Sequence, residues 1–186
     1  MSLPEPAKRR LSHTRRITLQ GYAREDGLYD IEAELVDVKD YGFPSKARGF
    51  IEKDEPLHHM QVRVTISEEM EVQDAVAVTI AGPYHICPQG ALNIRHLIGA
   101  KIQPGWKRIV QKAIGGSEGC THITELMGPV ATVAFQTIYG ERAKQAREAG
   151  TDNNTAQETQ SASLLNSCYA LTEGREGAIE NGTAGG

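Results

Sequence analysis

The stretch YDIEAELV, residues 29–36, alternates apolar and acidic side chains almost perfectly. Successive side chains of a β-strand point to opposite faces, so this alternation predicts a strand with one apolar and one acidic face. The segment before it, RRITLQGYAREDG, ends in Asp26-Gly27, two residues that favour the left-handed conformations of a tight turn. Residues 15–38 are therefore predicted to form a β-hairpin.

A second hairpin is predicted further along the chain. HHMQVRVTI (58–66) and EVQDAVAVTI (71–80) flank the turn residues SEEM. The expected core side of this hairpin consists of Met60, Val62, Val64, Ile66, Val72, Val76, Val78 and Ile80. Residues 39–56 are polar, with Gly and Pro breaks, and are expected to be a connection. Four strands in two hairpins can pair antiparallel through short turns.

The pattern becomes helical after residue 81. Pro88 suits a helix start, and QPGWKRIVQKAIGG reads as a short helix that ends at Gly115-Gly116. A longer helix is predicted from Thr121, and Pro129 is expected to kink it or delay its regular start. Its apolar stripe is Ile123, Leu126, Val130, Val133 or Ala134, and Thr137 or Ile138. Strands followed by helices indicate an α+β fold in which the helices pack on one face of an antiparallel sheet.

The chain of 186 residues is expected to hold one domain with flanking segments. We expect a flexible tail over 1–14, a single α+β domain over 15–150 and a polar linker over 151–163. The apolar fragment LLNSCYAL, 164–171, is expected to dock on its own chain or on a neighbour, and 172–186 to be a second flexible tail.

Composition excludes several classes of function. A net charge of −4 gives no reason to expect nucleic-acid binding, and no apolar run is long enough to span a membrane. Three cysteines at unpatterned spacing do not form a disulfide framework, so a cytoplasmic protein is expected.

The segment GGSEGCTHITELM, residues 115–127, carries reactive residue types at a predicted helix start. Cys120 would lie in the first turn, where the positive end of the helix favours the thiolate form. His122 and Glu125, three residues apart, would be neighbours, and a carboxylate beside imidazole makes a general base. The structural alternative stays open: Cys120 would be a small buried side chain, Thr121 a helix cap and His122 a solvated residue.

Two more clusters are candidates. PLHHM, 56–60, opens a strand, so His58 and His59 point to opposite faces and His58 shares the face of Met60. His58 is either a structural residue or a ligand. Asp30, Glu32 and Glu34, with Arg24 and Asp26 nearby, form a solvated acidic face. If that face is instead covered, crowding would raise a carboxyl pKa and produce a base.

These motifs together resemble a bacterial family catalogued as a domain of unknown function. The shared pattern is R-x-D-G-x-Y/W-D-I-E, P-L-H-x-M, G-C-T-H-x-x-E-L and a late cysteine in a short apolar segment, and it covers most of residues 15–171. Two departures are His59, where the family commonly has Asp, and Pro129. Matching positions are Arg24, Asp26, Asp30, Glu32, His58, Cys120, His122, Glu125 and Cys168.

The resemblance implies an association with genes for catabolism of aromatic compounds, including lignin-derived aryl ethers and phenylcoumarans. No phosphate loop, nucleophile elbow or dinucleotide fingerprint is present, so we expect a cofactor-independent lyase or isomerase that releases formaldehyde from an aromatic intermediate. The base would be His58 or His122, with Glu125 orienting it and Arg24 steering the substrate. The full catalytic set is His58, His59, His122, Glu125, Cys120, Asp30 and Glu32. The substrate-binding set is Arg24, Asp26, Tyr29, Arg63, Tyr84 and Trp106.

Two alternatives remain. Cys120, His122, Cys168 and His58 could bind zinc or an iron–sulfur cluster, and the order of elements is similar to that of IscU-type scaffold proteins. A non-catalytic accessory protein would use residues 141–171 as a docking arm. The expected partner is a small aromatic substrate, without nucleic acid or membrane, and a homodimer is left open.

Overall fold

The computed structural model describes residues 2–150 together with Tyr169 and Thr172. The predicted linker, most of the predicted docking segment and Cys168 lie outside the described residues. The chain divides into two compact units, Met1–Ile138 and Tyr139–Gly186. The sheet, its core and the candidate site belong to the first unit. Among the described residues, no helix is both long and apolar enough to cross a bilayer.

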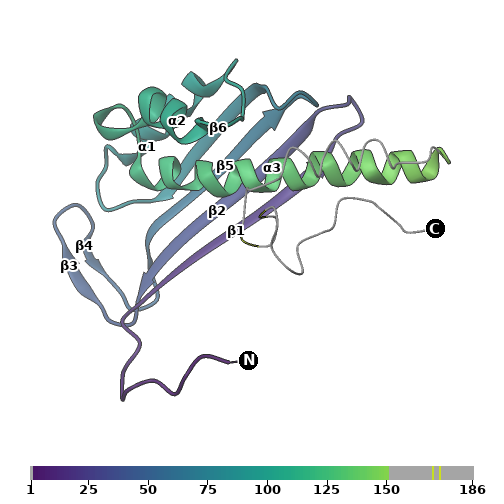
Figure 1. Ribbon diagram of the computed structural model, residues 1–186. Helices are drawn as coiled ribbons and strands as arrows, with labels where there is room; N and C mark the ends of the chain where they lie inside the picture. The colour runs from purple at the N-terminus through teal and green to yellow at the C-terminus, as the bar shows by residue number, and fades with distance from the viewer. Residues whose placement is uncertain (1, 151–168, 170–171, 173–186) are drawn as a thin grey trace. The chain divides into compact units, whose positions relative to one another are not determined.

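Four long strands form one antiparallel sheet in the order β1-β2-β5-β6 (Figure 1). Their bounds are His13–Ala23 for β1, Tyr29–Lys39 for β2, Pro56–Ile66 for β5 and Val72–Ala81 for β6. Both predicted hairpins are confirmed, and β2 pairs with β5 to join them. Within the predicted connection, β3 (Phe43–Ser45) and β4 (Gly49–Ile51) pair as a separate two-stranded sheet, which was not predicted from the sequence.

The helical half follows the predicted order. It contains α1 (Cys87–Ala91), η1 (Leu92–Leu97), α2 (Trp106–Ile114), η2 (Gly116–Glu118) and α3 (Thr121–Glu148). Pro88 lies in the first turn of α1, where its missing N–H has no helical partner to lose. The helix α3 begins at Thr121 as predicted and continues through Pro129, so the proline does not delay its start.

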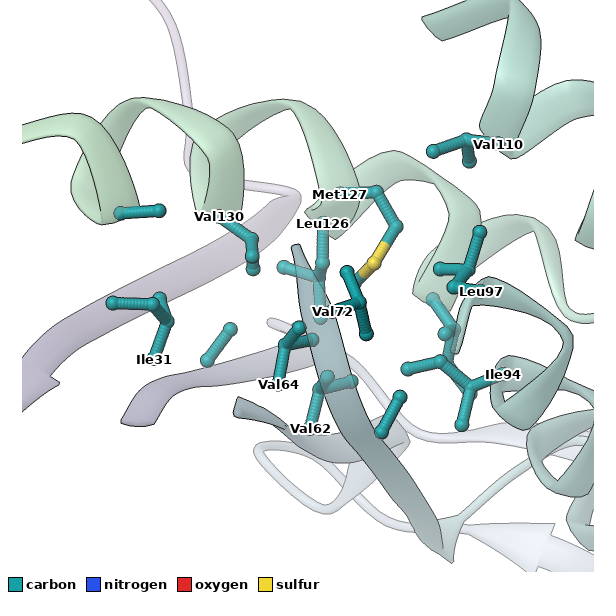
Figure 2. Close-up of a cluster of buried hydrophobic side chains, with 14 of the residues drawn as sticks. Ile31, Val62, Val64, Val72, Ile94, Leu97, Val110, Leu126, Met127 and Val130 are labelled. Atoms are coloured by element: carbon teal, nitrogen blue, oxygen red, sulfur yellow. The ribbon is translucent and has the colours of Figure 1, made fainter. Parts of the chain in front are cut away.

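The core lies between one face of the sheet and the helices (Figure 2). The odd-numbered residues of β2 and the even-numbered residues of β5 supply the sheet side. On α3 the buried stripe is Ile123, Leu126, Met127, Val130, Ala134 and Ile138. Burying each large apolar side chain stabilises the fold by about 1.5–3 kcal/mol, so this stripe anchors the first turns of α3 on the sheet.

The predicted core side of β6 is wrong beyond its first residue. Val72 is buried, but Val76, Val78 and Ile80 are 49%, 53% and 55% exposed. The cause is a register shift between Thr65 and Ile66 of β5, which places an extra residue in β6. A bulge of one residue reverses the alternation that follows it, so Ala75 faces the core and the larger side chains face outward.

Candidate functional site

A row of polar side chains lies on the helix-facing side of the sheet, at one end. Arg15 of β1 is directly opposite Asp37 of β2, and Asp37 is directly opposite His58 of β5. Residues opposite one another in an antiparallel pair lie on the same face. All three therefore occupy positions on the face that elsewhere carries the core, and the charged row continues the apolar rows of Leu35 and Met60.

Asp37 is the centre of this row and is 1% exposed. Arg15 donates to both of its oxygens from Nε and Nη2, each over 2.8 Å. His58 Nδ1 lies 3.0 Å from Oδ2, and His13 Nε2 lies 3.2 Å from Oδ1. Burial alone would raise the carboxyl pKa, but hydrogen bonds and charge from Arg15, aided by His58, outweigh it and hold the Asp37 pKa at about 2. Asp37 is therefore an anion.

The start of α3 brings the GCTH motif onto this row. The rings of His122 and His58 lie 3.9 Å apart between centroids, tilted by 36°. His122 Nε2 is 3.9 Å from Asp37 Oδ2, and Cys120 Sγ is 3.8 Å from His122 Nδ1. Glu125, one turn further on, accepts a hydrogen bond of 2.6 Å from Arg15. Motifs that are more than sixty residues apart in sequence thus meet at one point.

The glycine directly before Cys120, Gly119, is required by the packing of the loop. A side chain at Gly119 would collide with the carbonyl oxygen of Ile114, because the loop passes directly over the end of α2. The Thr124 hydroxyl lies 2.9 Å from that same carbonyl and 3.0 Å from the carbonyl of Cys120. This packing holds the first turn of α3 against the end of α2, and so fixes the position of Cys120 and His122.

The surroundings of both imidazoles lower their pKa and so favour the neutral form. Burial lowers the pKa of His58, although Asp37 opposes this. Burial also lowers the pKa of His122, and the neighbouring His58 lowers it further. Because Nδ1 of His58 faces the Asp37 carboxylate, that nitrogen carries the proton and Nε2, on the opposite side of the ring, keeps its lone pair. A neutral imidazole with one free nitrogen is a base.

A hollow of about 580 Å³ opens beside these residues. His58, Cys120 and His122 form one wall, and η2 and the segment before α1 form much of the rest. Its apolar lining includes Met60, Pro83, Tyr84 and Ile86. A concave site with apolar walls and a few converging polar groups is the usual form of a small-molecule site.

Asp37, His58 and His122 also form a possible metal-binding group. One ligand atom each from Asp37, His58 and His122 lie within 4.8 Å of one another. However, both Asp37 oxygens already accept from the Arg15 guanidinium, which would place a fixed positive charge beside a divalent cation. Of the predicted ligands, Cys120 is outside this group of three and Cys168 lies outside the described residues. The donor set therefore fits a metal poorly.

The first motif does not reach this site. Arg24 pairs with Asp26 and Asp30 beside the turn between β1 and β2. On the outer face of the sheet Glu32 pairs with Arg63, and His59 pairs with Glu34. A hydrogen bond from Arg24 lowers the pKa of Asp26. Hydrogen bonds from Gln61 and His59 lower the pKa of Glu34. The pKa values of Asp26 and Glu34 are therefore lowered, not raised as the covered-face alternative expected.

The remaining predicted substrate-binding residues are also separated. Tyr29 and Trp106 are 6% and 7% exposed and belong to the core. Trp106 Nε1 donates to the carbonyl of Met127 over 2.8 Å, which ties α2 to α3. Of the predicted substrate-binding set, only Tyr84 lies in the wall of the hollow.

Sequence reasoning missed Asp37, Arg15 and His13. A signal was present: Asp37 has the same parity as Tyr29, Ile31, Ala33 and Leu35, so strict alternation places a carboxylate on the core face. Arg15 likewise shares the parity of Leu19, which packs against the core. A charged residue at a core position is the informative exception in such a pattern.

Comparison with known proteins gives one match. A family model described as "Protein of unknown function (DUF2889)" matches residues 13–136. That range contains the whole sheet and all the site residues described above. No curated protein and no solved structure matches the chain.

Proposed function

Since the chain belongs to DUF2889, a family described only as proteins of unknown function, we propose an activity from the site itself: a cofactor-independent lyase acting on a small aromatic alcohol. The observation that carries this proposal is the Asp37–His58 pair at the edge of an apolar hollow. A carboxylate that holds one imidazole nitrogen and leaves the other free is an arrangement for moving a proton.

His58 is the proposed base. Asp37 fixes its tautomer through Nδ1, and the two hydrogen bonds from Arg15 keep Asp37 from turning. The lowered pKa of His58 keeps it unprotonated near neutral pH, ready to accept a proton. A base positioned in this way contributes about a hundred-fold to ten-thousand-fold to a rate.

The proposed step is a retro-aldol cleavage of a phenylcoumaran-type alcohol. His58 takes the proton from the hydroxyl of a hydroxymethyl group, the carbon–carbon bond breaks and formaldehyde leaves. The electron pair released on carbon forms a double bond and expels the ring oxygen as a phenoxide, giving a stilbene. The imidazolium of His58 returns its proton to the phenoxide, so the reaction needs no oxidant, reductant or cofactor.

The walls of the hollow support an aromatic substrate. Pro83, Tyr84 and Ile86 offer apolar surface in the hollow that His58 also lines, and Tyr84 adds a ring that can stack. Glu118 is the acidic residue of the lining, and no Lys or Arg is among the described lining residues. The substrate expected from this lining is uncharged, and Arg24, which lies elsewhere, does not steer it.

The test is release of formaldehyde from phenylcoumaran-type alcohols by the purified full chain. His58→Gln is expected to lower the rate by about a hundred-fold or more, because the free nitrogen is lost. The matched control is His59→Gln, the adjacent imidazole on the outer face, which is expected to retain the wild-type rate. Absence of formaldehyde from the wild type, with and without added zinc, would refute the proposal, as would equal rates for the wild type and His58→Gln.

A metal site is the second candidate, favoured only by the closeness of Asp37, His58 and His122. Elemental analysis of protein purified without chelator decides it. About one equivalent of a transition metal that disappears in His122→Asn would establish a metal centre, whereas less than about a tenth of an equivalent excludes it.

A further inference from the structure

We infer that Cys120 is a second reactive group of the hollow, a thiol nucleophile with His122 as its proton acceptor, and that it adds to α,β-unsaturated aldehydes that carry an aromatic ring. This reaction differs from the proposed lyase step and uses a different base. It requires the same hollow but does not require that the hollow release formaldehyde.

The geometry of Cys120 and His122 supports this assignment. The sulfur lies 3.8 Å from Nδ1 of His122, which is within the range for a thiol that donates to nitrogen. The other ring nitrogen, Nε2, faces the Asp37 carboxylate at 3.9 Å. A proton on Nε2 is therefore favoured, and Nδ1 keeps the lone pair that can take the proton of the thiol.

Cys120 lies next to the N-terminus of α3. The Thr124 N–H donates to the Cys120 carbonyl over 2.9 Å, so Cys120 is the N-cap residue, immediately before α3. The first turn of α3 contains no acidic residue. Unpaired N–H groups and the positive end of a helix stabilise a thiolate.

Access is the second requirement for a nucleophile. Cys120 is only half-buried, and it lines the hollow together with Met60, Tyr84 and Ile86. An aromatic enal that places its ring on these apolar side chains would bring its carbon–carbon double bond to the same wall as the sulfur. The ligand class follows from this combination of an apolar pocket and a soft nucleophile.

The proposed addition balances without a further reagent. The thiol proton passes to Nδ1 of His122, and the sulfur forms a bond to the β-carbon of the enal. The π electrons of the carbon–carbon double bond move toward the carbonyl to give an enolate. The proton held by His122 then passes to the α-carbon, which leaves a thioether and a free aldehyde.

Cys87 provides an internal control. It lines the same hollow and is also a free thiol, so a reagent reaches both cysteines under the same conditions. Among the described residues, no imidazole forms a hydrogen bond with Cys87, in contrast to Cys120. Comparing the reaction rates of Cys120 and Cys87 therefore separates the effect of His122 from the effect of access to the hollow.

The experiment treats the full chain with cinnamaldehyde, quenches with borohydride at intervals and locates the adduct by peptide mass spectrometry. Cys120 is expected to react at least about tenfold faster than Cys87, and His122→Phe to slow Cys120 at least about tenfold, because the proton acceptor is removed while the ring remains. Cys120→Ser is expected to abolish the fast adduct. Circular dichroism of each variant checks that it is folded.

Equal rates at Cys120 and Cys87 in the wild type would overturn the inference, and this comparison needs no variant to fold. An unchanged rate at Cys120 in folded His122→Phe would overturn it as well. The outcome is separable from that of the lyase test: fast adduct formation without formaldehyde release refutes the lyase alone. Formaldehyde release with an unreactive Cys120 refutes the thiol alone.

Discussion

Replacing Arg15 with glutamine is expected to reverse the direction of the pKa shift at Asp37. In the wild type, burial raises this pKa and the hydrogen bonds and charge of Arg15 lower it by more, from the ordinary 3.8 to about 2. Without the guanidinium, burial, which is the largest single cause, is opposed only by the hydrogen bond and charge of His58, the two smallest causes. The Asp37 pKa is then expected above 3.8. At about 1.4 kcal/mol per pKa unit, this difference from the wild type corresponds to a coupling energy between Arg15 and Asp37 of at least about 2.4 kcal/mol.

The same shift fixes how acid affects stability. A carboxyl whose pKa is depressed by folding stabilises the protein above its unfolded pKa and loses this contribution as the pH falls through its folded pKa. For Asp37 the contribution is complete above about pH 5 and disappears progressively between about pH 4 and pH 2, with about 1.1 kcal/mol already lost at pH 3. In Arg15→Gln this acid-labile contribution is absent.

The measurement is the pH titration of the side-chain carboxyl carbon of Asp37 by NMR, with the signal assigned from its absence in Asp37→Asn. The matched control is Glu125→Gln, which removes the other carboxylate bound to Arg15 and leaves both hydrogen bonds to Asp37 in place. The wild type and this control are expected to remain ionised at pH 3. A wild-type midpoint at or above 3.8, or a midpoint that stays near 2 in Arg15→Gln, would show that the guanidinium does not govern this carboxyl.

Three further predictions concern packing, and each is measured by urea denaturation at neutral pH. Gly21→Ala is expected to lower the free energy of unfolding by about 1–3 kcal/mol, because the new methyl group collides with the Thr137 side chain; a fully additive Thr137→Ala double variant would argue against that contact. Trp106→Phe is expected to cost about 1–3 kcal/mol, because the hydrogen bond to the Met127 carbonyl is lost and the smaller ring leaves a gap, and a loss below about 0.5 kcal/mol would contradict the hydrogen bond's role. Val78→Gln is expected to change stability by less than about 0.5 kcal/mol, and a large loss would mean that this side chain is buried.

The sheet could be predicted because its strongest signal is local. The alternation in residues 29–36 needs no knowledge of partners, and short turns leave antiparallel hairpins as the simplest pairing. The outward turn of Val76 and Val78 could not be predicted in the same way. It depends on the extra residue opposite Thr65 and Ile66, and a bulge is fixed by how two strands fit together.

The candidate site was predictable only in the parts that lie in single motifs. His58 was placed on the face of Met60 by parity, and Cys120 and His122 by the helix start, and the structure brings these predictions together. That the two motifs meet depends on the loop before α3 packing against α2, and neither motif indicates which element Gly119 and Thr124 contact. The acidic residues of the first motif were prominent in the sequence, but strand parity turns them to the opposite face.

The buried charges at this site are not explained by stability. A buried ion pair commonly contributes no more than apolar side chains of the same volume would, because both charges lose their water. The rows that end at Arg15, Asp37 and His58 carry apolar residues along the rest of their length, so the fold itself does not require charge there. The charges occur where the sheet meets the hollow and the start of α3, and there Asp37 orients His58 while burial lowers the pKa of both imidazoles. Such an arrangement is what proton transfer requires, and for that reason we propose that the function depends on Asp37 and His58.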